Sequence, residues 1–324
     1  MKICLISFDF FDFDNYIVKE LQRQQIDANH IDFSKFSYKY SSFFEKTSNF
    51  FLKLFLNKNI KKIKAEEFIL KRLDELGHQD IVLVIRPDRI SKNTHLKIKQ
   101  HADKYIAYIY DSCKRIPIEH LLKGVFCKVF SFDSLDCEKY NFIFITNYIY
   151  LEKIEVSNDY NIENTAFVIM SIDERFDFLN KVANYFTTNK VDFKFIMVGK
   201  KVPKRSNSNI IFVKKPIHIK ETIAELEKAK IFLDFIRKDQ NGLSFRIFEA
   251  MAMQRKIITT NTSIKKYDFY NPTNILVLED KNINIDAAFL ETPYVPLEDS
   301  IYSRYTINHW VRTMFELEKN TNCN

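Results

Sequence analysis

Glycine is scarce in this chain, with four residues in 324, and a single tryptophan contrasts with 31 phenylalanines. Because glycine is so rare here, we expect each glycine to lie where the backbone needs a conformation that other residues avoid. The cores are expected to be rich in phenylalanine. The five cysteines form no C-x-x-C pair. This spacing argues against a disulfide framework or a metal site and predicts reduced thiols. No apolar run reaches the roughly 18 residues that a transmembrane helix needs, so none is expected.

Signals for secretion and for nucleic-acid binding are also missing. The apolar run at residues 3–6 is too short for a signal peptide, so we expect a cytoplasmic protein. Zinc-finger spacing, RNP-like strands and a basic zipper are absent, which places nucleic acid last among the partners that the formal net charge of +7 suggests. Anionic lipid and anionic substrates remain. The first strand–helix–strand pattern lacks the glycine fingerprint of dinucleotide sites, which argues against NAD binding there.

The chain is long enough for two domains, and its composition, 46% hydrophobic and 28% charged, is that of a folded protein. In the first half, short apolar runs alternate with segments of helical spacing. The expected strands are residues 2–7, 26–32, 80–85, 104–110, 128–132 and 142–145. Runs without polar alternation are typical of buried parallel strands, so this half predicts an open, mostly parallel sheet with helices on both faces.

A second series of strands follows a polar, asparagine-rich stretch at residues 151–164, which is the expected linker. The strands of this series are expected at residues 165–170, 193–198, 210–213, 231–235, 257–260 and 274–278. We therefore predict an α/β protein with an N-terminal domain at residues 1–155 and a C-terminal domain at residues 156–324. Each domain is expected to be doubly wound and Rossmann-like.

Residues 36–76 mix phenylalanines and leucines with lysines at helical spacing. One interpretation is a pair of helices that packs on the N-terminal sheet and keeps its lysines in solvent. The other is an interfacial helix on an anionic bilayer, where each basic side chain contributes about 1 kcal/mol and the aromatic rings enter the headgroup level. The two interpretations are compatible if only part of the apolar face is exposed. Peripheral contact with the inner face of an anionic cytoplasmic membrane is therefore one expectation.

The stretch that organises the chain is residues 240–261, QNGLSFRIFEAMAMQRKIITTN. A strand precedes it, Gly242 breaks the chain, Ser244 can cap a helix, and another strand follows. Such a unit aims backbone N–H groups and the positive end of a helix dipole at one point, which suits a phosphate. Arg246 adds donors for a diphosphate, and Glu249 could accept hydrogen bonds from a ribose diol. The alternative is a surface arginine paired with a carboxylate and an ordinary solvated glutamate.

Three parts of this stretch resemble the donor-site segment of GT-B glycosyltransferases of the bacterial lipopolysaccharide, capsule and spore-coat type. They are Gly242-Leu243-Ser244-Phe245-Arg246, Phe248-Glu249-Ala250 and Lys256-Ile257-Ile258-Thr259-Thr260-Asn261. They match a glycine-rich turn, an SxRxFEA helix and a K-x-I-T-T-N strand. Where that family has a glycine near the helix end, this chain has Gln254. The resemblance implies two Rossmann-like domains that face each other across a cleft, the GT-B fold, with terminal helices that cross back to the first domain.

The resemblance also implies how the C-terminal domain would bind a donor. In those enzymes the acidic residue of this helix binds the ribose of a nucleotide-sugar, and Glu249 occupies its position. Arg175 and, more weakly, Lys200 match basic residues near the diphosphate, although solvated charges are the alternative for both. The loop at Pro216 and Ile217 corresponds to the region that lines the base. The implied donor site comprises Arg175, Lys200, Pro216, Ile217, Gly242, Leu243, Ser244, Arg246 and Glu249.

Three acids end expected strands of the first half: Asp9, Asp111 and Asp133. Ligands of such sheets lie beyond the carboxyl ends of strands, so one acid is a candidate base for an acceptor hydroxyl. Helix N-caps and turns are the alternative roles. Asp111 is the first catalytic candidate, because YIYDSCKR is similar to a YDS stretch of the related transferases, and Asp9 is the second. Asp12-Phe13-Asp14 has the form of a metal motif but precedes a helix near the N-terminus, so no metal site is expected.

These features predict a metal-independent glycosyltransferase. It would move a sugar from a UDP- or GDP-linked donor to a hydroxyl of a glycan or lipid-linked acceptor, for a bacterial lipopolysaccharide, capsule or O-antigen. No cofactor is expected beside the nucleotide-sugar substrate. Ser244, Arg246 and Arg175 would stabilise the charge of the leaving diphosphate. Two alternatives stay open: a nucleotide-sugar-modifying enzyme such as an epimerase, and a non-catalytic nucleotide-binding component of a polysaccharide assembly complex.

Overall fold

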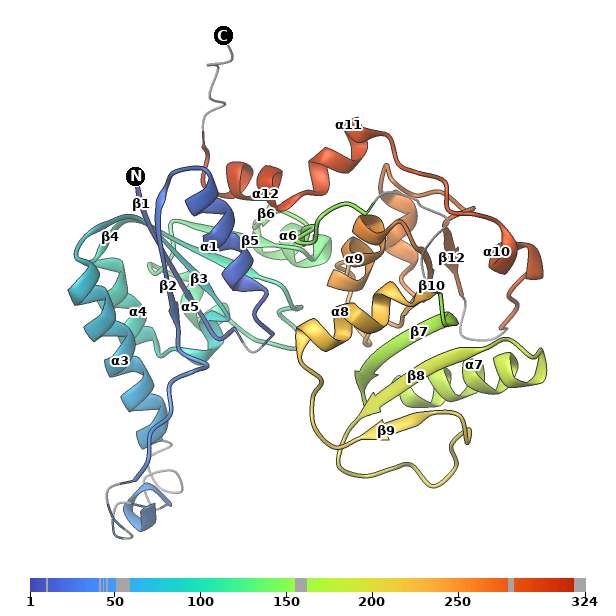
Figure 1. Cartoon of the computed structure of the whole chain (residues 1–324). Coiled ribbons are helices and arrows are strands. Elements are labelled where there is room, and N and C mark those ends of the chain that lie inside the picture. Colours follow the sequence, from blue (N-terminus) through green and yellow to red (C-terminus); the bar gives the residue numbers. More distant parts are fainter. Residues whose placement is uncertain are drawn as a thin grey trace. The chain divides into compact units, whose positions relative to one another are not determined.

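The chain forms two compact units in this computed structural model, and each unit is built on a six-stranded sheet (Figure 1). The structure describes residues 1–9, 11–40, 42, 44, 46–50, 59–154, 162–278 and 283–317. Unit 1 comprises Met1–Ile145 with Val311–Asn324, and unit 2 comprises Thr146–Trp310. The domain boundary expected at residues 155/156 lies outside the described residues, as do residues 155–161 of the expected linker.

Unit 1 alternates strands and helices, and the expected strands of the first half are confirmed. Its strands are β1 (Lys2–Ser7), β2 (Asp27–Asp32), β3 (Gln79–Ile85), β4 (Ala102–Ile109), β5 (Lys128–Ser131) and β6 (Ile143–Phe144). Its helices are α1 (Asp14–Arg23), α3 (Ile60–Leu76), η1 (Pro87–Arg89), α4 (Lys92–Lys99), α5 (Glu119–Leu122) and α6 (Ser134–Tyr140). All neighbouring strands pair in parallel, in the order β2-β1-β3-β4-β5-β6.

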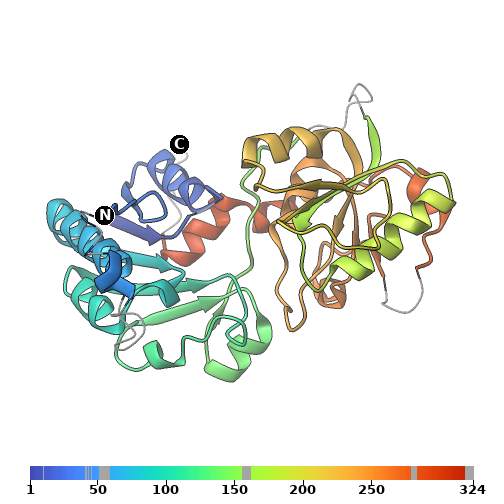
Figure 2. The same cartoon turned by 90° about the horizontal axis from the view of Figure 1, so that it is seen from below.

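Helices cover both faces of the unit 1 sheet because the strands are apolar on both faces. Cys4 and Ile6 of β1 share a buried cluster with Ile69 of α3 and Ile98 of α4. Leu5, also fully buried, alternates with them and points to the opposite face. Figures 1 and 2 show α1 on that opposite face. The continuous apolar run of β1 thus follows from burial on two sides.

Unit 2 repeats this layout, and its expected strands are confirmed as well. Its strands are β7 (Asn164–Ser171), β8 (Phe193–Val198), β9 (Ile211–Val213), β10 (Ala229–Asp234), β11 (Lys256–Thr259) and β12 (Ile275–Val277). Its helices are α7 (Phe176–Thr188), α8 (Ile219–Glu227), α9 (Phe245–Met253), η2 (Thr262–Lys266), α10 (Ala287–Glu291), α11 (Asp299–Tyr302) and η3 (Ser303–Tyr305). The strands are parallel in the order β12-β11-β10-β7-β8-β9.

Phenylalanine fills the two layers of the unit 2 core, as the composition predicts. Phe186 of α7 and Phe195 of β8 lie in the cluster on one face of the sheet. Phe232 of β10 and Phe248 of α9 lie in the cluster on the other face. All four side chains are fully buried.

Each sheet contains a point at which the strand order reverses. In unit 1 the chain runs from β1 outward to β2 and then returns to place β3 on the other side of β1. In unit 2 it runs from β7 outward to β8 and β9 and then returns to place β10 on the other side of β7. Loops diverge at such switch points, so a crevice forms beyond the carboxyl ends of the two strands. These edges are where binding sites are expected.

The final segment of the chain belongs to unit 1, although it follows unit 2 in sequence. Helix α12 (Ile307–Met314) runs from one unit into the other. After it, Glu316 forms ion pairs with Lys104 of β4, at 3.1 Å, and with Lys128 of β5. Phe315 beside it is 2% exposed. No helix in the described part of the chain combines the length and the hydropathy of a bilayer-spanning segment.

Candidate functional site

The segment from β10 to β11 has the predicted order of strand, loop, helix and strand. Helix α9 begins after Ser244, whose Oγ accepts a hydrogen bond from the backbone N–H of Arg246 at 3.2 Å. The predicted N-cap is therefore confirmed. At the other end Gln254 adopts the left-handed conformation, with φ of 52°. A glutamine thus takes the backbone geometry that glycine usually supplies at this position.

A buried carboxylate ties the ends of β10, α9 and β11 together. Asp234 is the last residue of β10, and its Oδ1 accepts a hydrogen bond from Ser244 Oγ at 2.7 Å. Its Oδ2 accepts one from Thr259 Oγ1 of β11 at 3.0 Å. Burial raises the pKa of Asp234, and these hydroxyl donors oppose that rise. The network fixes the start of α9 against the carboxyl edge of the sheet.

Arg246 and Glu249 form a buried ion pair in the first half of α9. Arg246 NH1 lies 2.7 Å from Glu249 Oε2, and the two side chains are 14% and 4% exposed. Glu249 Oε1 also accepts a hydrogen bond from the hydroxyl of Tyr150. Arg246 is thus paired with a carboxylate, as the alternative interpretation expects, but the pair is not on the surface. Glu249 is not an ordinary solvated residue.

The short Arg246–Glu249 contact is an ion pair without hydrogen-bond geometry. Arg246 NH1 therefore stays a buried donor that makes no hydrogen bond within the described residues. The Glu249 carboxylate therefore holds the guanidinium group of Arg246 near the start of α9.

The loop before α9 is shaped by side-chain donors that hold its carbonyl groups. Asn261 Nδ2 donates to the carbonyls of Asn241 and Gly242, both at 3.3 Å. Ser263 Oγ donates to the Asn241 carbonyl at 2.7 Å, and Asn147 Nδ2 donates to the Leu243 carbonyl at 2.9 Å. Polar side chains from two other segments, residues 261–263 and Asn147, therefore fix the path of the glycine loop.

A cavity of about 620 Å³ lies at the switch point of unit 2. We call it the β7–β10 pocket. It is lined by Glu174, Arg175, Phe178, Phe235, Ile236, Arg237, Lys238, Asp239, Thr260, Thr262 and Leu278. These residues follow β7, β10, β11 and β12, so the pocket lies where the topology predicts a ligand site. Its volume is within the range of about 300–1,000 Å³ that is usual for small-molecule sites.

Two guanidinium groups of this pocket are held by one carboxylate. Arg175 donates to both oxygens of Asp173, at 2.8 and 2.6 Å, and to the carbonyl of Phe235 at 2.9 Å. Arg237 donates to Asp173 Oδ2 at 3.1 Å. Burial alone would raise the pKa of Asp173, but the hydrogen bonds and charge of Arg175 bring it below the ordinary value. Asp173 therefore stays ionised and positions both arginines.

The structure brings part of the predicted donor site together. Arg175 and Arg246 both lower the pKa of Asp234 through their charge, so they lie near the same carboxylate. Pro216 and Lys200 are exposed, and Ile217 packs beside the core cluster of α9. Within the described residues, no hydrogen bond or ion pair links these last three to Arg246 or Glu249. Their role in donor binding remains a prediction.

Sequence reasoning missed four residues of this site. Asp173 and Arg237 lie two and three residues after the ends of β7 and β10, and charged residues just beyond a strand are the signal that could have indicated them. Asp234 falls within an expected strand, and the strand pattern gives no sign of its role. Tyr150 has no local signal, because it lies 99 positions before Glu249 in the chain.

The acids of unit 1 have different surroundings. Asp9 is 5% exposed, and its Oδ2 accepts a hydrogen bond from the Asn15 N–H at 3.0 Å. Burial raises its pKa to about 6, and the charges of Asp32 and Asp12 act in the same direction. Such a pKa suits a general base near neutral pH.

Asp111 and Asp133 are engaged in local interactions. Asp111 Oδ2 pairs with Arg115 NH1 at 2.9 Å, and its side chain is 18% exposed. Asp133 caps α6 by accepting a hydrogen bond from the Leu135 N–H at 3.0 Å, which confirms the alternative role for that residue. Strand β3 separates β1 from β4, so Asp9 and Asp111 follow strands that are not neighbours. No group of three or more metal-ligand residues was found in the described part of the chain.

Among known proteins, this chain resembles several solved structures. No protein-family model and no curated protein matches the sequence. An α-glucosyltransferase in complex with UDP and a DNA 13-mer aligns with a TM-score of 0.54 and 11% identity, over 85% of this chain and 81% of that chain. UDP-GlcNAc 2-epimerase from Neisseria meningitidis, bound to UDP-GlcNAc, aligns with a TM-score of 0.53 and 11% identity, over 98% and 99%.

A third structure is the UDP-GlcNAc 2-epimerase of Methanocaldococcus jannaschii, in complex with UDP-GlcNAc and UDP. Its TM-score is 0.50 and its identity 12%, over 98% of this chain and 100% of that chain. At such low identity the likeness concerns the fold and not the activity. Together with two doubly wound six-stranded sheets, it shows that this chain has the predicted GT-B fold.

Proposed function

We propose that this protein is a glycosyltransferase that uses a nucleoside-diphosphate sugar, UDP- or GDP-linked, as its donor. The observation that carries this proposal is the β7–β10 pocket, which joins a nucleotide-sugar-sized cavity to the basic side chains of Arg175, Arg237 and Lys238. The buried Arg246–Glu249 pair, which follows the same strand β10, supports it. Solved structures of this fold contain UDP or a UDP-sugar.

In this proposal unit 2 binds the donor. Arg175, Arg246 and the N-terminus of α9 would stabilise the negative charge that develops on the diphosphate as the bond to the sugar breaks. Glu249, held by Tyr150, would accept hydrogen bonds from the ribose. Lys200, Pro216 and Ile217 complete the proposed donor site at the base and diphosphate. This charge stabilisation needs no metal ion.

Unit 1 would bind the acceptor, a hydroxyl of a glycan or lipid-linked saccharide. Asp111 and Asp9 are the proposed bases. The resemblance of residues 242–261 to donor segments of lipopolysaccharide and capsule enzymes supports assigning the acceptor to a bacterial surface glycan. A cytoplasmic location is part of the same proposal.

The donor site is tested by variants of its buried pair. Glu249→Gln keeps an acceptor for the Tyr150 hydroxyl but removes the charge, and Arg246→Ala removes the guanidinium group. Charged hydrogen bonds contribute about 1.5–3 kcal/mol, so each variant should weaken UDP or GDP binding by roughly 10–100-fold and lower turnover. Isothermal titration calorimetry and a transfer assay measure the two effects.

Exposed residues of the same unit provide matched controls. Glu221→Ala on α8 and Arg205→Ala in the loop before β9 should bind nucleotide like the wild type. Thermal melting checks that each variant is folded. Wild-type affinity and turnover in both Glu249→Gln and Arg246→Ala would refute the proposed donor site.

The nucleotide is identified by ligand-dependent stabilisation. UDP, GDP, CMP and dTDP are added separately, and the melting temperature is recorded. A ligand that binds only the folded chain stabilises it by about 2.7 kcal/mol at a concentration of 100 times its Kd. We expect a rise for UDP or GDP. A flat response to all four compounds would count against a nucleotide-sugar enzyme.

Epimerisation of a nucleotide-sugar is the second candidate, because two of the three aligned structures are UDP-GlcNAc 2-epimerases. An epimerase inverts a stereocentre of the sugar and needs no acceptor. Incubation with UDP-sugars alone, followed by NMR of the products, separates the two reactions. An altered UDP-sugar formed without acceptor would favour the epimerase. A chain that binds nucleotide but changes no sugar under either condition would be a non-catalytic component of an assembly complex.

We also propose that unit 1 contacts an anionic membrane surface, where a lipid-linked acceptor would lie. Phe44 and Phe50 are 84% and 62% exposed, in the lysine-rich segment 36–76. Residues 51–58 of that segment lie outside the described residues. Flotation should show binding to vesicles with anionic lipid and not to neutral vesicles, and Phe50→Ser should reduce it. Failure to float with either vesicle would exclude the membrane proposal.

A further inference from the structure

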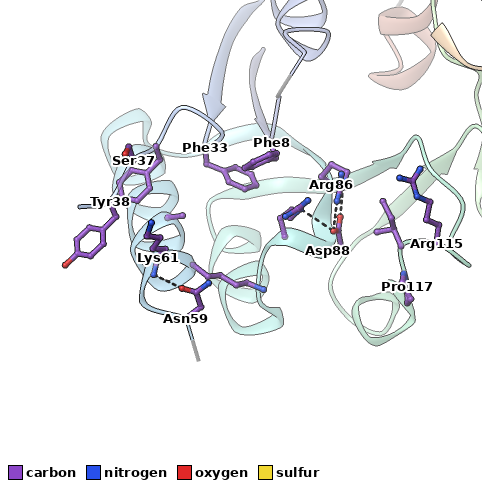
Figure 3. Close-up of a pocket in the computed structure, with 15 residues that line it drawn as sticks. Phe8, Phe33, Ser37, Tyr38, Asn59, Lys61, Arg86, Asp88, Arg115 and Pro117 are labelled. Atoms are coloured by element: carbon purple, nitrogen blue, oxygen red, sulfur yellow. Dashed lines mark hydrogen bonds and ion pairs between the residues drawn. The ribbon is translucent and has the colours of Figure 1, made fainter. Parts of the chain in front are cut away.

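A second cavity, of about 730 Å³, lies in unit 1, and we call it the basic pocket (Figure 3). Five basic residues line it: Lys61, Lys62, Arg86, Arg89 and Arg115. One acid, Asp88, is among the lining residues. All residues that line this pocket belong to unit 1, whereas the proposed donor site belongs to unit 2.

The topology places this pocket where a ligand is expected. Its walls follow the carboxyl ends of β1, β2, β3 and β4, and the switch point of this sheet lies between β1 and β3. Figure 3 shows Asn59 and Lys61 on one side, Arg86 and Arg115 on the other, and the rings of Phe8 and Phe33 between them. The cavity is therefore bounded by several loops that meet at one edge of the sheet.

A left-handed residue turns the chain into this pocket. Arg86 directly follows β3 and has φ of 62° and ψ of 53°. An arginine in this region is strained, and such strain concentrates at functional sites. The turn leads at once into η1, so that Arg86, Asp88 and Arg89 all reach the pocket from one short segment.

Positive charge exceeds negative charge around the cavity. Asp88 is engaged by Arg86 through two hydrogen bonds of 2.9 Å, and it also lies 3.7 Å from Arg89. Arg115 pairs with Asp111. Lys61 and Lys62 form no ion pair with any residue that the structure describes. An oxyanion in the pocket would relieve the repulsion among these groups.

Aromatic rings supply the remaining wall. Phe8 and Phe33 pack edge to face with ring centroids 5.5 Å apart. The guanidinium group of Arg89 lies 5.1 Å from the Phe8 centroid, which positions it over the ring. Phe36 and Tyr38 also line the cavity. Aromatic side chains beside cations suit a ligand with an apolar C–H surface and an attached anionic group, which is the character of an acidic saccharide.

We propose that the basic pocket binds a saccharide that carries a phosphate or carboxylate group, with Arg89 and Lys62 on the oxyanion and the aromatic wall on the sugar. The inference rests on the proposed function in one respect, because it makes this saccharide the acceptor. It then assigns the acceptor a chemical class: an anionic glycan or a sugar phosphate, and not a neutral one.

Binding of simple probes tests the pocket directly, without a donor. The full chain is titrated at low ionic strength with glucose 1-phosphate, glucuronic acid, glucose and inorganic phosphate, by calorimetry and saturation-transfer NMR. At least one anionic sugar should bind about tenfold or more tightly than glucose, and salt should weaken it. The phosphate and carboxylate arms show which oxyanion is preferred. Equal affinity for glucose, or inorganic phosphate bound as tightly as the anionic sugars, overturns the proposal.

Variants place that binding in the basic pocket. Lys62→Gln and Arg89→Gln each remove one exposed cation and should weaken the anionic sugar by roughly 3–10-fold. Lys97→Gln on α4 removes an exposed lysine outside the pocket and should change nothing. The double variant Lys61→Gln/Lys62→Gln gives a second measurement if Arg89→Gln fails to fold. Unchanged affinity in the folded pocket variants contradicts the assignment.

A UDP titration of the same proteins separates this inference from the proposed function. UDP binding should be roughly 10–100-fold weaker in Glu249→Gln and unchanged in Arg89→Gln. Sugar phosphate binding should be unchanged in Glu249→Gln and roughly 3–10-fold weaker in Arg89→Gln. If UDP binds as expected but no anionic sugar does, the pocket inference fails and the donor site stands. If an anionic sugar binds in an Arg89-dependent way while UDP does not bind, the proposed function fails and the pocket stands.

Discussion

The carboxyl group of Asp9 shows how far burial can move a single ionisable residue. Its pKa of about 6 lies above the ordinary value of 3.8, so the folded chain keeps this proton where an unfolded chain has lost it. The contribution of this proton to the stability of the folded state is fully present below pH 3.8 and is lost as the pH rises through about 6. The asparagine side chain of the Asp9→Asn variant cannot ionise. As the pH is raised from 3.8 to about 6, the free energy of unfolding of this variant should therefore rise relative to that of the wild type. Urea unfolding at several pH values measures this; a constant difference would contradict it.

The hydroxyl of Tyr150 is the second residue whose role can be isolated. It donates to Glu249, which is 3% exposed, and Tyr150→Phe would leave that carboxylate oxygen without this donor. We expect a loss of about 1–3 kcal/mol in the free energy of unfolding and weaker nucleotide binding. Tyr140→Phe, which removes an exposed hydroxyl in unit 1, is the control. Equal stability of Tyr150→Phe and wild type would show that the buried hydrogen bond contributes nothing.

Residues of the candidate site could be predicted from sequence only where local chemistry determines them. Ser244 was predicted as an N-cap because a hydroxyl before an apolar helix has few other roles. The pairing of Glu249 with Tyr150 could not be predicted, because it depends on how a distant segment passes the helix. Asp173 likewise acquires meaning only when β7 and β10 become neighbours.

Among the elements, helix α3 ends at a glycine whose backbone conformation no other residue adopts readily. Gly77 has φ of 71° and ψ of −163°, and no atom lies within 4 Å of the position that a Cβ would occupy. Gly77→Ala should therefore destabilise the chain by about 1–3 kcal/mol through backbone strain alone. Glu75→Ala, on the exposed last turn of α3, should have a small effect. Chemical denaturation compares the two, and equal stability would exclude the strain.

Strands were the most predictable elements, since an unbroken apolar run buried on both faces of a parallel sheet leaves little choice of structure. Helix ends were less predictable. Gln254 takes a left-handed C-cap conformation that its side chain does not favour, so the geometry is imposed by the turn from α9 into β11. The order of strands, and with it the two switch points, depends on pairing between distant segments and could be anticipated only from the resemblance to a known fold.

At the scale of the whole molecule, unit 1 is completed by the far end of the chain. Deletion of residues 311–324 would remove Glu316, which pairs with Lys104 and Lys128, and the buried side chain of Phe315. We expect faster hydrogen exchange in β4 and β5 and no change in β7 and β10. Asp299→Asn, which breaks an exposed ion pair with Lys153 in unit 2, should leave β4 and β5 unaffected. Unaltered exchange in β4 and β5 of the truncated chain would contradict this role.

The return of the last residues to the first sheet has a consequence for biosynthesis. The ribosome makes all of unit 2 after the strands of unit 1 have emerged but before the segment that finishes their packing exists. At translation rates of about 5–20 residues per second, that interval is on the order of 10–30 s. During this interval the N-terminal sheet lacks the C-terminal segment that packs against it. Termination of translation just before residue 311 would release chains whose defect lies in their oldest part.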